Sequence, residues 1–440
     1  MGYIKKYYKY IFIFFMFLVW NLILVPLNLD EIWNYGFAHN VYNGLVPYKD
    51  FNIILTPLYP FIMSSLFFVF GSNLLVFHIE HALILTILSY FLFKMFNNKA
   101  WLIIMLLFLP LPVSFPSYNV FLFFLLVIVI YLEENKANDY LIGFLLGLII
   151  LTKQSVGVCL LLPSLYYFKD FKKIKKRFIG FILPVLVFLI YLICTNSFIQ
   201  FLDLCLFGLF DFASDNGKVF NFYWVLFICL IGITLYFIKK DKNNIRNYYV
   251  LGFYSILIPL FDTYHFQIMF LAFLLLVLDK IKNNTIVNFK LLAIGIIIGV
   301  SCVTFVKKYD GNIMYPNNIN HFEYRMIDSY GLNITNEVNN YIRKNNDKEF
   351  VFICSNGYYF KIINDMKITY LDLINSGNWG YNGSDKLYNE LKKKKDAIFF
   401  VDESELSPIK QTDKRAIKYV LKNGDKIDSV GGYDIYVINK

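Results

Sequence analysis

Charged residues are scarce in this 440-residue chain. Asp, Glu, Lys and Arg make up 17% of it and hydrophobic residues 58%, whereas soluble domains average ~25% charged and about 45–50% apolar residues. This composition excludes an ordinary soluble enzyme, and the apolar excess also excludes intrinsic disorder. We therefore expect the apolar residues to gather in runs of about 20, the length that crosses a ~30 Å hydrocarbon core.

Motifs for metals, disulfides and nucleotides are also missing. The chain has 6 cysteines, but none forms a CxxC pair or a Cys/His spacing typical of a metal site. Only Cys354 lies in the polar C-terminal tail, so a disulfide within the tail is excluded. The tail contains neither GxGxxG nor a P-loop, and no internal repeat is apparent. We therefore predict neither a metal nor a cofactor.

Basic clusters predict the membrane topology. Lys5, Lys6 and Lys9 precede the apolar run 10–27, and no small-x-small cleavage site follows it. We predict an uncleaved first helix with a cytoplasmic N-terminus. Later clusters at 169–177 and 239–246 lie in short segments between apolar runs. They are therefore topology markers, and binding to nucleic acid is not expected.

Threading the chain through these markers predicts about eleven transmembrane helices and an external C-terminus. The predicted spans are 10–27, 74–96, 100–116, 120–132, 140–152, 155–168, 178–195, 222–238, 248–261, 266–279 and 289–306. The apolar segment 54–70 is ambiguous, because counting it as a span would move the cluster at 169–177 outside. We expect it to lie on the outer face, and a true span with an error elsewhere is the alternative.

The predicted fold class is an all-α polytopic membrane protein with a C-terminal extracytoplasmic α/β domain. The membrane module covers 1–306, with a first outer loop at 28–73, and the outer domain covers 307–440. In the tail, helical patterns alternate with short apolar runs, which favours a small three-layer sheet domain. The expected strands are 349–355, 396–402 and 433–438, and the expected helices are 336–346, 385–395 and 414–423.

The first outer loop contains the densest group of candidate site residues. Asp30 and Glu31 come where the first span leaves the membrane. A carboxylate there can act as a general base toward a hydroxyl acceptor, or it can simply be an acid favoured at the start of a helix. Trp33, Tyr48 and Asp50 are candidate sugar or acceptor contacts, although the aromatics also fit an interfacial belt.

Further candidates lie at the outer ends of later spans. Lys153 follows a strongly apolar run, so its ammonium either faces a polar cavity or reaches the outer headgroups. His265 and Tyr264 lie in a turn between two spans, where a histidine is either a structural or a binding residue. His78, Glu80 and His81 form either a buried polar network or the wall of a cavity.

Several motifs together resemble the GT-C glycosyltransferases, in particular the protein O-mannosyltransferase and lipid A aminoarabinose transferase type and their bacterial relatives. The first helix is followed by the external pair Asp30-Glu31 and by a GxxPYxDF…TPLYP loop that ends in 70–72. Gly143-x-x-x-Gly147 precedes Leu151-Thr152-Lys153-Gln154, and a Tyr/His turn at 261–266 precedes a late span. The resemblance covers the layout of 1–306.

The resemblance implies a metal-independent, inverting transferase in the cell membrane with an external active site. The donor would be a sugar, hexosyl or pentosyl, linked to polyprenyl phosphate. The acceptor would be a protein, lipid or other component of the cell envelope. Asp30 matches the catalytic position with Glu31 beside it, and Lys153 and His265, next to Tyr264, match positions that bind the donor phosphate.

The sequence departs from the family pattern at two positions. Relatives often carry an acid at the position of Asn119, and an Arg where His78 is the nearest candidate.

Two rival functions remain. The first rival is a polytopic transporter or a flippase of lipid-linked glycans, which would predict inverted repeats and broken helices. The second is a polymerase or ligase of surface glycans with a different fold, which would place its large outer loop late in the chain.

Overall fold

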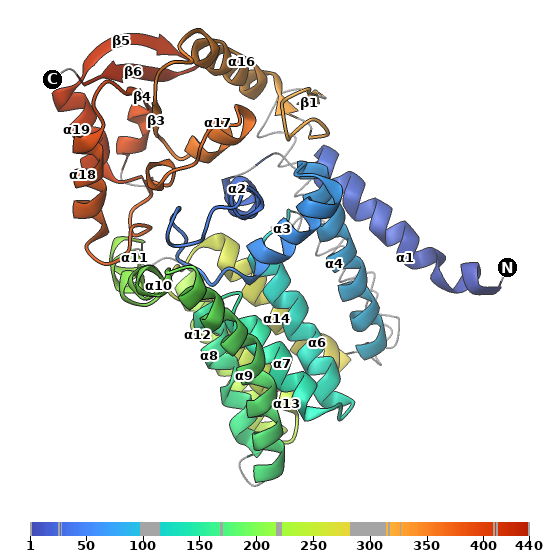
Figure 1. Ribbon diagram of the computed structural model, residues 1–440. Coiled ribbons are helices and arrows are strands. Elements are labelled where there is room, and N and C mark those ends of the chain that lie inside the picture. The colour runs from blue at the N-terminus through green and yellow to red at the C-terminus, as the bar shows by residue number, and fades with distance from the viewer. Residues whose placement is uncertain are drawn as a thin grey trace.

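The computed structural model forms a bundle of helices with a small sheet domain at one end (Figure 1). The structure describes residues 2–24, 27, 29–96, 115–167, 170–216, 222–281, 314–315, 317–325, 327–407, 410 and 412–438. The predicted span 289–306 and nearly all of the predicted span 100–116 lie outside these residues.

Each of the other nine predicted spans contains a helix. The helices of the membrane module are α1 (Gly2–Val19), α2 (Leu29–Tyr42), α3 (Leu58–Phe70), α4 (Leu74–Met95), α6 (Tyr118–Glu134), α7 (Asp139–Ile150), α8 (Gln154–Leu160), α9 (Phe171–Cys194), α10 (Phe198–Leu202), α11 (Gly208–Asn216), α12 (Phe222–Lys240), α13 (Ile245–Phe253) and α14 (Thr263–Ile281). Short 3₁₀ or π turns extend several of them, at Trp20–Leu24, Leu162–Tyr167, Asp203–Phe207 and Tyr254–Leu257.

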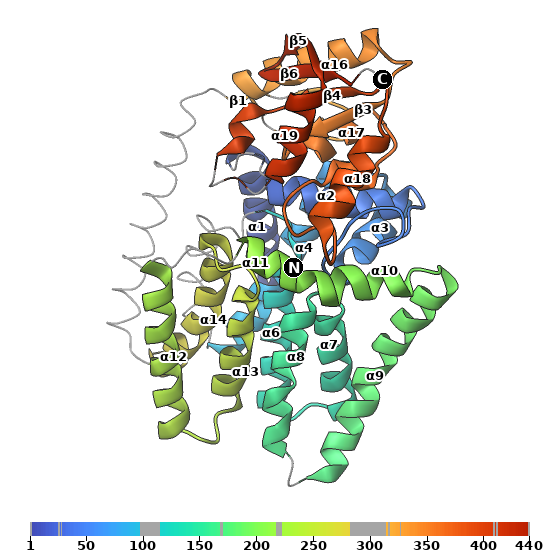
Figure 2. The same cartoon turned by 90° about the vertical axis from the view of Figure 1, so that its left-hand side faces the viewer.

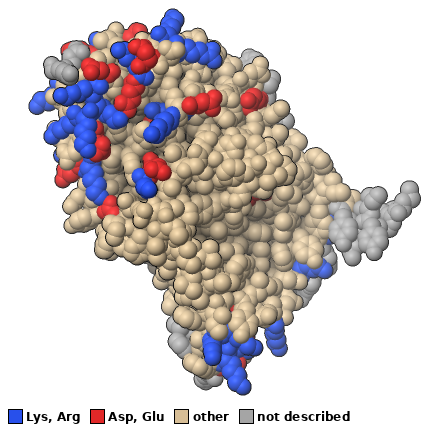
Figure 3. Space-filling model, viewed as in Figure 1, with Lys and Arg blue, Asp and Glu red and all other residues tan. Residues whose placement is uncertain are grey.

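By length and apolar composition, three helices in the described part of the chain can cross a membrane. They are Leu74–Met95, Phe171–Cys194 and Tyr223–Lys240, and five shorter apolar helices accompany them. The predicted number of eleven spans is therefore not confirmed. The space-filling view separates charged side chains at the two ends of the molecule by a broad uncharged belt, as expected for a membrane protein (Figure 3).

Glycines allow α7 and α9 to pack in close contact. A Cβ atom added at Gly143 would lie 2.0 Å from the carbonyl oxygen of Arg177, and one added at Gly180 would lie 2.1 Å from that of Tyr140. Small residues at such contacts let helix backbones approach each other in membranes. The Gly143-x-x-x-Gly147 motif thus has a packing role in this fold.

The first outer loop folds into α2 and α3, which lie between the bundle and the sheet domain (Figure 2). The helix α3 has 13 residues and is therefore about 20 Å long, shorter than the ~30 Å hydrocarbon core. Its first residue, Leu58, donates a backbone hydrogen bond of 2.9 Å to Leu151 at the end of α7. The helix α3 thus packs against the end of α7, and the placement of 54–70 on the outer face stays a prediction.

The C-terminal domain has the predicted three layers. Its elements are β1 (Met314–Tyr315), β2 (Ile327–Asp328), α16 (Ser329–Lys344), β3 (Phe350–Ile353), α17 (Gly357–Ile363), a 3₁₀ turn (Tyr370–Asp372), α18 (Gly383–Lys393), β4 (Ile398–Val401), a 3₁₀ turn (Glu403–Leu406), α19 (Lys414–Asn423), β5 (Asp425–Val430) and β6 (Tyr433–Val437). The main sheet has the order β3-β4-β6-β5, and its β3–β4 pair is parallel while the other pairs are antiparallel.

Alternate strand residues of this sheet face two cores. Phe350 and Phe352 contribute to the core that includes α16 and α17, whereas Val351 and Ile353 contribute to the core that includes α18 and α19. A strand covered on both faces reads as a continuous apolar run, which is how β3 and β4 were predicted. The sequence prediction did not include α17 and β5.

The C-terminal domain contacts two parts of the membrane module, the first outer loop and the segment that contains α10 and α11. From α10 and α11, Asp203 accepts a hydrogen bond of 3.2 Å from the Tyr381 amide, and Asp211 accepts one of 2.6 Å from the Asn382 amide. On the first outer loop, the Tyr358 ring packs so close to α2 that a Cβ atom at Gly36 would lie 2.4 Å from it. The domain thus packs against α2, the helix that carries Asp30 and Glu31.

Candidate functional site

Asp30 lies in the first turn of α2, half-buried and close to a second carboxylate, Asp262. Burial and the negative charge of Asp262 raise the pKa of Asp30 to about 7. A carboxylate with a pKa near the operating pH is suited to general base catalysis, because it is both available and basic enough. The raised pKa of Asp30 is thus compatible with the predicted role as general base, which stays a prediction.

Asp262 lies in the turn directly before α14. Its Oδ1 accepts hydrogen bonds from the His265 amide at 2.7 Å and from His265 Nδ1 at 2.9 Å. Although burial opposes it, the contact with His265 and the nearby Lys153 ammonium lower the pKa of Asp262. Asp262 therefore remains negatively charged while it raises the pKa of Asp30.

Residues at the start of α6 connect α2, which carries Asp30, with the Asp262–His265 pair. Asn34 Nδ2 donates to the Asp30 carbonyl at 2.7 Å, and Asn34 Oδ1 accepts from the Tyr118 amide at 3.2 Å. Asn119 Nδ2 lies 3.4 Å from His265 Nε2. Because His265 Nδ1 faces a carboxylate, Nε2 of the neutral ring is the acceptor for this amide. Asn119, which stands where relatives often carry an acid, thus orients His265.

Tyr264 is held in the same cluster. Its hydroxyl lies 2.6 Å from Ser117 Oγ, and its ring stacks on Phe115 with the centroids 5.3 Å apart. Ser117 also caps α6, since its Oγ accepts from the Val120 amide at 3.3 Å. The predicted residues Asp30, Tyr264 and His265 thus converge from α2 and α14 around the start of α6.

Lys153 faces the interior from the break between α7 and α8. Its side chain is buried, with 3% of the residue exposed, and Nζ donates to the Ile256 carbonyl at 2.8 Å. The ammonium lies 5.9 Å from the centre of the Tyr118 ring. A lysine that reached the headgroups would be exposed at its tip, so this structure favours the alternative in which Lys153 faces the polar cluster.

Glu31 has a different environment from its neighbour. It is fully buried, and its carboxylate lies 2.6 Å from His78 Nε2 and 3.2 Å from the Arg325 guanidinium. Although burial opposes it, Arg325 and His78 lower the pKa of Glu31. Glu31 is therefore an ionised partner in a buried network with Arg325 and His78. On α4, Glu80 accepts a hydrogen bond of 3.3 Å from the Tyr59 hydroxyl.

Two of the three predicted acceptor contacts, Tyr48 and Asp50, form hydrogen bonds within the loop. The Tyr48 hydroxyl is buried and donates to the Leu55 carbonyl at 2.8 Å, and an Asp50 oxygen accepts from the Val46 amide at 2.7 Å. Trp33 is half-buried, and its indole nitrogen has no hydrogen-bond partner among the described residues.

Sequence reasoning did not assign Asp262, Asn34 or Arg325 to the site. The spacing of Asp262 and His265, three residues apart in a tight turn, was a usable signal for the first. For Arg325 the sequence offered none, because it lies 294 residues from Glu31. Within the described residues, no group of three or more His, Cys, Asp or Glu side chains could hold a metal ion.

The sequence matches no protein-family profile and no curated protein. The structure of this chain is nevertheless similar to solved protein structures. The fold is that of ArnT from Cupriavidus metallidurans. Its crystal structure bound to undecaprenyl phosphate aligns with a TM-score of 0.60 and 11% identity over 99% of this chain and 98% of ArnT. The apo crystal structure aligns with the same TM-score and coverage at 10% identity.

This similarity covers the bundle and the C-terminal domain together. ArnT is a GT-C lipid A aminoarabinose transferase, so the fold expected from the sequence resemblance is confirmed. At 10–11% identity, the similarity to ArnT establishes the fold and leaves the reaction to be argued from the site residues.

Proposed function

We propose that this protein is a membrane glycosyltransferase that takes a sugar from a polyprenyl-phosphate donor on the outer face of the membrane. The observation that carries the proposal is the pair Asp30 and Asp262, in which burial and a second carboxylate raise the pKa of the half-buried Asp30 to about 7. The ArnT fold supports it, since one ArnT structure holds undecaprenyl phosphate.

In the proposed reaction, Asp30 is the general base. The acceptor hydroxyl gives its proton to the Asp30 carboxylate and its oxygen forms a bond to the sugar C1. The bond from C1 to the phosphate oxygen breaks, and polyprenyl phosphate leaves with the electron pair. Attack from the face opposite the leaving group inverts the configuration at C1.

Lys153 and His265 are the proposed phosphate partners, with Tyr264 beside them. Lys153 is buried near Asp262, and burial lowers the pKa of its amino group to about 7, so an anionic ligand bound there would favour the charged form of Lys153. The charged form of Lys153 would stabilise the leaving phosphate as it departs. This arrangement would serve the reaction without a metal, as the sequence resemblance implies.

The rival function is a transporter or flippase of lipid-linked glycans. We propose a transferase because the C-terminal domain packs on α2, the helix that carries Asp30, and a transporter has little need of such a domain. Purified protein in liposomes, supplied with a radiolabelled polyprenyl-phosphate sugar and a mixture of cell-envelope acceptors, separates the two functions. A transferase moves the label to an acceptor and releases polyprenyl phosphate, whereas a flippase changes only the leaflet in which the intact donor lies.

A further inference from the structure

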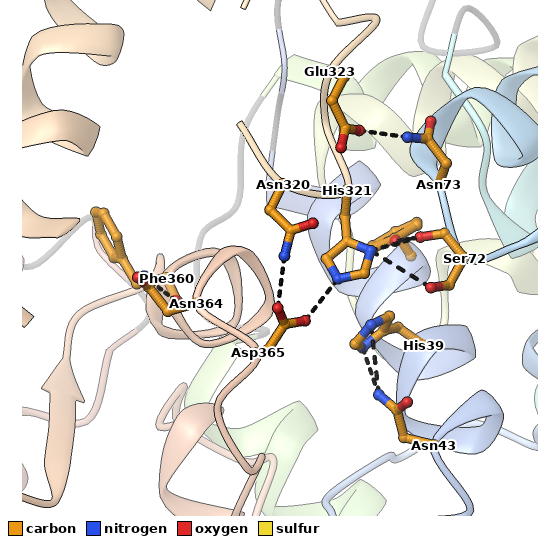
Figure 4. A network of polar contacts seen from close by, with 11 residues as sticks. His39, Asn43, Ser72, Asn73, Asn320, His321, Glu323, Phe360, Asn364 and Asp365 are labelled. Carbon is orange, nitrogen blue, oxygen red and sulfur yellow. Dashed lines mark hydrogen bonds and ion pairs between the residues drawn. The ribbon is translucent and has the colours of Figure 1, made fainter. Parts of the chain in front are cut away.

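One segment of the C-terminal domain holds the junction between α2, α3 and α4. This clamp segment, residues 317–325, lies between β1 and β2. Figure 4 shows His321 and Glu323 facing the first outer loop. His321 Nδ1 lies 2.9 Å from the Ser72 carbonyl oxygen, and its own carbonyl accepts from the Leu74 amide at 2.8 Å. Glu323 accepts a hydrogen bond of 2.5 Å from Asn73 Nδ2.

The clamp segment is itself fixed to the C-terminal domain. His321 Nε2 lies 2.9 Å from Asp365 Oδ1, and Asn320 Nδ2 donates to the other Asp365 oxygen at 2.8 Å (Figure 4). Asn317 makes hydrogen bonds within the segment, to the Arg325 carbonyl and from the Ile319 amide. The segment is therefore a braced connection, through which the domain contacts the loop that carries Asp30.

Arg325 ends the clamp segment and reaches farthest into the membrane module. It is 1% exposed. One guanidinium nitrogen donates to the Leu22 carbonyl at 3.0 Å and another to Glu31 Oε2 at 3.2 Å, while His78 contacts the other Glu31 oxygen. A single arginine thus joins the end of the first helix, the start of α2 and, through Glu31, the helix α4.

Helical geometry links this arginine to Asp30. Successive residues project about 100° apart around a helix, so Asp30 and Glu31 point to different sides of α2. The rotation of α2 about its axis therefore decides which groups Asp30 faces. Glu31 fixes that rotation through two buried contacts of its carboxylate, with Arg325 and with His78. If Arg325 is lost, a buried carboxylate loses its main counter-charge, and α2 must turn or shift to hydrate it.

We infer that Arg325 is a positioning residue, by which the C-terminal domain sets the orientation of α2 and so points Asp30 at the reacting hydroxyl. This inference rests on the proposed function. It also gives the outer domain a role in the reaction, because the site would be incomplete without that domain.

The test compares Arg325→Met and Arg325→Lys with the matched control Arg343→Met, whose arginine is exposed on α16 of the same domain. The full-length protein is used in nanodiscs, and rates are normalised to folded protein. A small displacement of a catalytic group lowers kcat strongly. We expect kcat to fall about 10- to 100-fold in Arg325→Met, with KM for the donor within about twofold, a partial recovery in Arg325→Lys, and wild-type rates in the control.

The double variant Glu31→Gln/Arg325→Met separates positioning from plain stability. Removing both charges should restore the melting temperature relative to Arg325→Met, since no buried charge is left without a partner, but the rate should stay low. A rate that recovers together with the melting temperature would overturn the inference, as would an unchanged kcat in Arg325→Met. If Asp30→Asn is also fully active, the proposed function itself is wrong; if Asp30→Asn is inactive, only the positioning role is.

Discussion

The two adjacent acids at the start of α2 illustrate how environment assigns roles at the scale of single residues. Asp30 is half-buried beside Asp262, and its pKa is raised to about 7. Glu31 is fully buried between Arg325 and His78, which hold its pKa below the ordinary value against the effect of burial. The first environment suits a group that takes up a proton, and the second suits a group that stays charged.

The raised pKa of Asp30 predicts that the rate of sugar transfer depends on pH. A general base must be deprotonated, so the acidic limb of the transfer rate should rise with pH through about 7. Burial also lowers the pKa of Lys153 to about 7, so the rate should fall again at higher pH as Lys153 loses its charge. The titratable groups that face Asp30 are Asp262, Tyr118 and Tyr264, of which only Asp262 carries charge near neutral pH. Asp262→Asn removes that repulsion and should move the acidic limb of the pH–rate profile to lower pH. A limb that stays in place would contradict the proposed pairing.

Lys153 should contribute to binding of the donor phosphate. Lys153→Met keeps most of the side-chain length but removes the charge. Since hydrogen bonds to charged groups contribute about 1.5–3 kcal/mol, we expect the Kd for undecaprenyl phosphate in detergent to rise roughly tenfold or more. Lys176→Met, an exposed lysine at the start of α9, is the matched control. Equal affinities in the two variants would leave Lys153 as a structural residue.

At the scale of the elements, close helix packing around α7 positions the break that carries Lys153. Gly143→Ala would place a methyl group 2.0 Å from a backbone oxygen of α9 and should force the two helices apart, at a cost of roughly 1–3 kcal/mol. The melting temperature in detergent should fall accordingly. Gly232→Ala is the control, because a Cβ there meets no atom within 4 Å, and its melting temperature should not fall.

Prediction of the elements from the sequence succeeded where burial leaves a periodic or continuous apolar pattern. The strand β3 (FVFI) is buried on both faces and was predicted. The strand β5 (DKIDSV) is almost wholly exposed at the edge of the sheet and has no such pattern. The helix α17 (GYYFKII) has only 7 residues, too few for a helical period to be distinguished from an apolar strand.

For the candidate site, the sequence indicated which segments contribute residues but not which of these residues contact one another. Asp30, the turn with His265, and Lys153 were each predicted, because polar residues beside apolar spans are conspicuous. The contact of Arg325 with Glu31 and that of Asp262 with Asp30 depend on tertiary packing between distant segments. No local pattern in one sequence encodes such pairs.

At the scale of the whole molecule, the positive-inside pattern predicts that the C-terminal domain lies outside the cytoplasm. The sheet domain covers the end of the bundle that contains α2 and α3 (Figures 1 and 2), so the orientation of this domain decides on which side Asp30 works. A reporter fused after Lys440 should be active only if it functions outside. Activity of a cytoplasmic reporter at that position would place the site on the wrong face for an external acceptor.

The central claim is that Asp30 takes the proton from the acceptor hydroxyl. Its most direct test is the single-turnover rate of sugar transfer by Asp30→Asn, measured in nanodiscs with a radiolabelled polyprenyl-phosphate sugar. Asparagine keeps the size and caps a helix well but cannot accept the proton, so the rate should fall by ~10²–10⁴-fold while donor binding and the melting temperature stay close to wild type. Asp347→Asn, an exposed acid of the outer domain, should transfer at the wild-type rate. Transfer at the wild-type rate by Asp30→Asn would contradict the claim.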